Sequence, residues 1–143
     1  MKFRYIRWMI KTALLYMVGG MGLGLCLYLA QRVSWFEWAL AWRTAHVHLL
    51  VVGVIMQLIM GVALWMFPRH QKEPYVTPER EGMTVYFLLN AGIVLRTFAE
   101  PMGVDSSIMY WMAFGGMVLQ MAASVYFLFL IFGRVRGIPP PSS

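Results

Sequence analysis

The sequence predicts an all-α protein that crosses a membrane four times, and three observations support this fold class. The chain has 143 residues, of which 60% are hydrophobic and 13% are charged, and its mean hydropathy is +0.64. A soluble domain of this length cannot bury so much apolar surface. Four apolar segments follow one another, each near the ~20 residues that a helix needs to cross the hydrocarbon core. The basic residues gather beside these segments rather than in one patch, which argues against nucleic-acid binding.

One membrane domain, residues 1–138, is expected to hold all four spans, and residues 139–143 are expected to form a disordered tail. The first span is too long for the apolar core of a cleaved signal peptide. The third span is the least apolar, and its helix should begin with Pro78 at the first helical position. Asp105 or Ser106 should cap the fourth. The expected spans cover about 9–30, 44–67, 80–100 and 107–133.

The distribution of basic residues places both termini in the cytoplasm, and the expected location is a prokaryotic-type inner (plasma) membrane. The N-terminus, the loop after the second span and the C-terminal tail carry four, three and two basic residues. The other side carries only Arg32, Arg43 and Arg96. This bias follows the positive-inside rule and indicates an integral, multi-pass protein. The segment "SWFEWALAW" is either a short interfacial helix or an extension of the second span, and the sequence does not decide between them.

Two histidines, His46 and His48, stand at the start of the second span, in "RTAHVHLLVVGVIMQLIMGVALWMFPR". An α-helix turns about 100° per residue, so the two rings should point to opposite sides. They therefore cannot chelate one metal ion or sandwich one haem within a single helix. Burying an ionisable side chain in a membrane is costly, which makes the pair a candidate functional site. Interhelical hydrogen bonding, haem ligation and copper or zinc ligation all remain open at this point.

The face of the second span below His46 contains small residues. Leu50, Gly53, Gln57 and Gly61 follow His46 at helical spacing. The two glycines would let a broad, flat ligand approach the backbone, and Gln57 could line its cavity. Small residues also promote plain helix packing, so this pattern does not decide the ligand by itself.

The stretch "AHVHLLVVGVIMQLIMGVALWMFP" resembles the haem-bearing helix of subunit I of haem–copper oxidases. The shared features are the A-H-x-H start, a small residue several positions later, and the aromatic-Pro end. In the third span, "LLNAGIVLRTFAEP" is similar to small oxidase-subunit-I-like membrane proteins. The large family has twelve spans arranged as three pseudo-repeats of four. The resemblance therefore implies that this chain is a single four-helix repeat.

The resemblance also implies a cofactor and an assembly. In that family the two histidines bind different haems on the two faces of the helix. Carried over to this chain, His46 and His48 would bind b-type haem shared between neighbouring subunits of a homo-oligomer, most simply a homotrimer. Arg96 and Arg43 are candidates to bind the haem propionates, since arginine binds carboxylates through two hydrogen bonds. For Arg96 the alternative is an ion pair with Glu100, four residues later.

The chain departs from the oxidase family in its histidine content. The third and last histidine, His70, lies in the polar loop "PRHQKEP" and is expected to be solvated, so the family's copper-binding histidines are missing. The missing histidines argue against an enzyme that reduces oxygen. The sequence predicts electron transfer or redox or gas sensing, with an unknown redox partner and with the second axial position either shared or open to a gas. The alternative is a haem-free or copper-binding accessory subunit of a respiratory oxidase.

Overall fold

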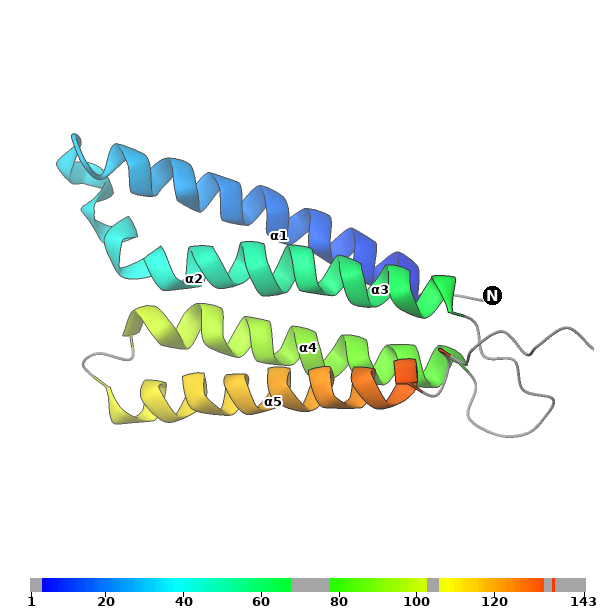
Figure 1. Ribbon diagram of the computed structural model, residues 1–143. Helices are drawn as coiled ribbons and strands as arrows, with labels where there is room; N and C mark the ends of the chain where they lie inside the picture. The colour runs from blue at the N-terminus through cyan, green and yellow to red at the C-terminus, as the bar shows by residue number, and fades with distance from the viewer. Residues whose placement is uncertain (1–3, 68–77, 103–105, 133–134, 136–143) are drawn as a thin grey trace, which may run out of the picture.

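The computed structural model describes residues 4–67, 78–102, 106–132 and 135, and all regular structure in these residues is helical (Figure 1). The elements are α1 (Arg4–Leu29), the 3-10 helix η1 (Ser34–Trp42), α2 (Arg43–His48), the π-helix η2 (Leu49–Met56), α3 (Gln57–Met66), α4 (Pro78–Ala99), the 3-10 helix η3 (Glu100–Met102) and α5 (Ser107–Phe132). Four helical segments are long and apolar enough to cross a membrane: Arg4–Leu29, Ser34–Met66, Glu79–Met102 and Ser107–Phe132. The predicted all-α class with four potential spans is confirmed.

Two helices begin where the sequence predicts. α4 begins at Pro78, where the missing N–H of proline costs nothing because the first turn has no intrahelical acceptor for it. α5 follows Ser106, whose hydroxyl accepts a hydrogen bond from the backbone N–H three residues later, at 3.5 Å. Asp105, His70 and the expected tail 139–143 lie outside the described residues.

The second span is not one uniform α-helix. The segment "SWFEWALAW" forms η1, a separate 3-10 helix that leads directly into α2, and the backbone departs from helical geometry at Trp42 (φ −92°, ψ 7°). After His48 the backbone widens into the π-helix η2 for eight residues before α3 begins at Gln57. Hydropathy does not predict this π-helix. Such segments occur frequently at functional sites.

The four long segments lie side by side, as Figure 1 shows. The C-terminal end of α1, all of α2, η3 and the N-terminal end of α5 lie at one end of the four segments. This end is called the histidine end because α2 carries His46 and His48. α4 packs closely on α5, and α1 lies against η2, α3 and α4. In the part of the chain that the structure describes, α1 and α5 make no extended contact. The largest fully buried side chains are Tyr5, Met9, Leu64, Leu89, Ile93, Gln57 and Val85.

α4 and α5 approach each other backbone to backbone at two glycines. A Cβ atom on Gly92 would lie 2.7 Å from the carbonyl oxygen of Gly116. A Cβ atom on Gly116 would lie 2.9 Å from the carbonyl oxygen of Gly92. Both distances are too short for real atoms, so any larger residue at either position would push the helices apart.

Replacing Gly92 by alanine should therefore lower the free energy of unfolding by about 1–3 kcal/mol, because the two helices must separate. Gly115→Ala is the matched control, since a Cβ atom there would meet nothing within 4 Å. Unfolding both variants by denaturant titration in detergent micelles measures the difference. Equal stability of the two variants would contradict the close approach of α4 and α5.

Candidate functional site

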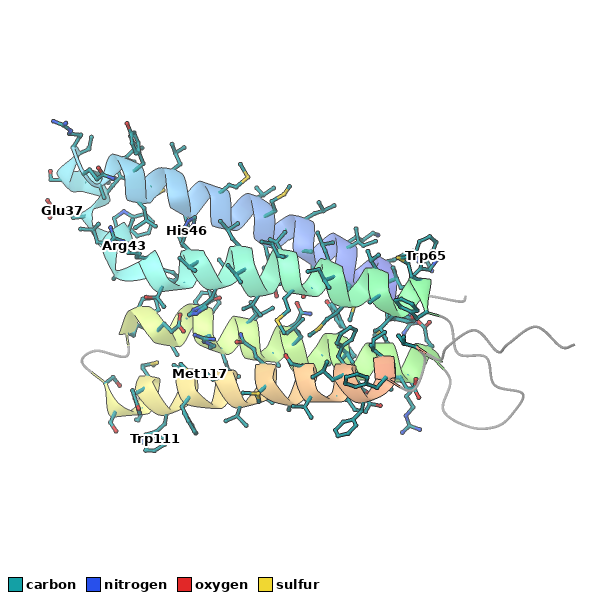
Figure 2. The ribbon with its side chains drawn as sticks, in the orientation of Figure 1. Glu37, Arg43, His46, Trp65, Trp111 and Met117 are labelled. Carbon is teal, nitrogen blue, oxygen red and sulfur yellow. The ribbon has the colours of Figure 1, made fainter. Side chains whose placement is uncertain are left out.

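The His46 ring points from α2 into the space beside α1 and is half-buried (Figure 2). Its Nδ1 lies 2.8 Å from the backbone carbonyl oxygen of Gly20. A carbonyl oxygen can only accept, so Nδ1 carries the proton and donates it, and Nε2 keeps the in-plane lone pair. The absence of a side chain at Gly24 allows this approach, because a Cβ atom there would lie 2.7 Å from Cε1 of His46. Nε2 is therefore the nitrogen through which His46 can bind a metal.

The His48 ring points to the other side of α2, toward the end of α4. Its Nδ1 lies 2.9 Å from Oε2 of Glu100, the first residue of η3. A carboxylate also accepts, so His48 is held with its proton on Nδ1 as well. The prediction that His46 and His48 serve different neighbours is confirmed, since one ring contacts α1 and the other contacts the end of the α4–η3 segment.

Arg96 of α4 connects three polar side chains. Its Nε donates to Oε1 of Glu100 at 2.7 Å, and its Nη1 donates to Oε1 of Gln120 on α5 at 2.8 Å. Its Nη2 lies 3.1 Å from Nδ1 and 2.9 Å from Nε2 of His48. The in-plane lone-pair directions of an imidazole diverge, so one atom nearly equidistant from both nitrogens lies over the ring face. The Nη2 atom of Arg96 therefore lies over the face of the His48 ring rather than along the Nε2 lone pair.

The polar cluster, defined as His48, Arg96, Glu100 and Gln120, is largely buried. The exposed fractions of the side chains are 11% for Arg96 and 10% for Glu100, and 25% for His48. The ion pair between Arg96 and Glu100, one of the two roles predicted for Arg96, is present at 2.6 Å. Charges in a low-dielectric interior interact more strongly than at a surface but also cost more to desolvate. The cluster consequently ties α2, α4 and α5 together at the histidine end.

Gly53 and Gln57, the two expected haem-contact residues below His46, lie against α1. A Cβ atom on Gly53 would lie 2.9 Å from the ring of Tyr16. Gln57 is fully buried, and its Nε2 donates to the backbone carbonyl oxygen of Met9 at 2.8 Å. Within one chain, α1 therefore fills the space below His46, and a haem contact by Gly53 or Gln57 stays a prediction.

Arg43, the second candidate for binding propionates, is exposed at the first position of α2 (Figure 2). Among the described residues no hydrogen bond or ion pair joins Arg43 to the polar cluster. The structure thus brings His48 and Arg96 together, whereas His46 and Arg43 lie outside this cluster.

Sequence reasoning missed two parts of this site. The first is Gln120 of α5, whose Oε1 accepts a hydrogen bond from the guanidinium of Arg96. Gly20 and Gly24 were not singled out, although their spacing of four residues is a known signal for close helix approach. That signal could have identified the α1 surface on which His46 rests.

Among the described residues, the potential metal ligands are separate imidazoles rather than a cluster. In the described ranges, no three His, Cys, Asp or Glu side chains come together as potential ligands of an ion. Zinc and copper sites usually draw three or four ligands from the protein. Haem iron needs only one or two axial ligands from the protein. Two separate imidazoles, each held at Nδ1, match that requirement.

The fold and the site define a helical protein suited to a membrane, with two oriented imidazoles at one end of its helices. Comparison of the chain with protein-family models, curated proteins and solved structures finds no match. The function is therefore argued from the site.

Proposed function

We propose that this chain is a b-type haem protein of the membrane, in which His46 and His48 are the axial ligands. The observation that carries this proposal is the orientation of the two imidazoles. Each ring donates its Nδ1–H to an oxygen atom, the Gly20 carbonyl or the Glu100 carboxylate, and keeps Nε2 as the basic nitrogen. Histidines that bind metals are almost always held through the other ring nitrogen in this way.

The opposite directions of the two rings favour haem sharing between subunits. In a closed ring of identical chains, His46 of one subunit and His48 of the next can bind one haem, and a homotrimer is the simplest such assembly. The exposed apolar faces of α1 and α5 would contact lipid or neighbouring subunits. On the charge distribution we propose that both termini lie in the cytoplasm. The membrane that we propose is a prokaryotic-type inner membrane.

The remaining site residues would hold the edge of the haem. Arg96, beside His48, and Arg43, at the start of α2, would bind the propionates. When bound, haem supplies one-electron redox chemistry, with a potential that depends on the axial ligands and the burial. The function would be electron transfer or redox or gas sensing rather than conversion of a substrate.

A reduced-minus-oxidised visible spectrum of the purified protein tests this proposal. The protein is expressed with haem supplied and kept in mild detergent. We expect the spectrum of a low-spin, bis-histidine b-type haem in nearly one-to-one ratio with the chain. Carbon monoxide binding to the reduced protein would instead indicate one open axial position. A folded protein without haem would overturn the proposal.

A second candidate function is supported by the contacts within a single chain. Both histidines, as well as Arg96, already have hydrogen-bond partners on neighbouring helices. Such contacts would suffice in a haem-free or copper-binding accessory subunit of a respiratory oxidase. The same preparation separates the candidates: metal analysis that finds copper, or neither copper nor haem, would favour the accessory subunit.

A further inference from the structure

The Glu100 carboxylate is held on both sides by groups of the polar cluster. Oε2 accepts the Nδ1–H of His48 at 2.9 Å, and Oε1 accepts the Nε–H of Arg96 at 2.7 Å. Arg96 is in turn fixed by Gln120 on α5 at 2.8 Å. The carboxylate is therefore aimed at one ring nitrogen by Arg96, four residues earlier in the same helical segment, and Arg96 is anchored to α5. The side chain of Glu100 is only 10% exposed.

The two histidines differ in what holds them. His46 donates to a neutral backbone carbonyl, whereas His48 donates to a charged carboxylate. A hydrogen bond to an ionised acceptor is shorter and roughly twice as strong as one between neutral groups. It also makes the imidazole a more electron-rich ligand at the opposite nitrogen. The two rings are thus chemically unequal although their sequence context looks alike.

We propose that Glu100 is a positioning residue that fixes the His48 ring and strengthens Nε2 as a metal ligand. This inference rests on the proposed haem function. It makes His48 the stronger of the two axial ligands and assigns Arg96 and Gln120 the task of orienting the Glu100 carboxylate. Glu100 itself does not touch the haem iron.

The test compares Glu100→Gln with the matched control Glu37→Gln. Both substitutions remove one carboxylate charge near the histidine end, but Glu37 is exposed on η1 (Figure 2). Loss of the carboxylate should weaken haem binding by about 10-fold or more, the usual effect of removing a partner of a ligating histidine. It should also raise the midpoint potential, because a less electron-rich ligand stabilises ferric haem less. Glu37→Gln should change neither quantity.

Two further measurements keep the inference testable. Glu100→Asp retains the charge, should fold if Glu100→Gln does not, and should give an intermediate potential. In the haem-free protein, nuclear magnetic resonance should show a strongly deshielded Nδ1–H proton on His48 that moves upfield in Glu100→Gln. An unchanged potential, affinity and proton resonance in folded variants would overturn the role of Glu100. A wild-type protein that never binds haem would instead overturn the proposed function, while the proton resonance would still report on Glu100.

Discussion

Replacing either His46 or His48 by alanine should abolish the low-spin haem spectrum. If one haem is shared between His46 of one subunit and His48 of the next, each substitution removes one axial ligand from every haem in the assembly. Haem held by a single axial ligand becomes high-spin and dissociates more readily. The measurement is haem per chain, together with the reduced spectrum, for each purified variant.

The third histidine provides the control for this experiment. His70→Ala removes the imidazole from the polar sequence between α3 and α4 and should leave the haem content and spectrum at the wild-type level. The shared-ligand arrangement would be wrong if either the His46 or the His48 variant kept a wild-type spectrum. A protein that purifies only as a monomer and still binds bis-histidine haem would argue against it equally.

Replacing Arg96 by alanine should destabilise the protein by about 3–5 kcal/mol, the usual effect of removing one partner from a buried ion pair. The substitution leaves the Glu100 carboxylate without its cation and Oε1 of Gln120 without its donor. An unpaired charge is especially unfavourable where water is excluded. The free energy of unfolding in detergent micelles measures this effect, and haem retention should fall in parallel if Arg96 also binds propionates.

Two further variants separate charge pairing from simple loss of packing. Arg43→Ala removes an exposed arginine of the same α2–α4 end and should change stability by no more than about 0.5 kcal/mol. The double variant Arg96→Ala with Glu100→Ala should lose less stability than the two single variants lose together, because it leaves no unpaired charge. Additive effects, or a loss below 1 kcal/mol for Arg96→Ala, would show that the pair contributes little.

Much of the fold could be predicted because a membrane restricts the backbone. Each peptide group in hydrocarbon must be hydrogen-bonded internally, so an apolar run of about 20 residues becomes a helix. Local chemistry predicted a helix start at Pro78 and another just after Asp105 or Ser106. Helical periodicity alone placed His46 and His48 on opposite sides of α2.

The partners of those side chains could not be predicted, because they depend on how the helices rotate and how closely they approach. Glu100 was placed one turn after Arg96, but only the α2–α4 packing brings its carboxylate to His48. The π-helix η2 depends on packing in the same way, since no local pattern in "LLVVGVIM" distinguishes it from an α-helix. The rotation of each helix about its axis is set by the sum of many weak side-chain contacts. Hydropathy is a mean over many residues and does not report these individual contacts.

By itself, therefore, the sequence determined the helical class, the number of potential spans, and the divergence of the two histidines. Only the tertiary structure decided which atoms hold the two rings. His46 is held by the backbone carbonyl of Gly20, which it reaches because Gly24 has no side chain. His48 is held by the carboxylate of Glu100, which Arg96 fixes. The physical reason is the separation of the interacting residues along the chain. Span and face follow from interactions within one helix, whereas the orientation of each imidazole follows from hydrogen bonds between helices that are far apart in the chain.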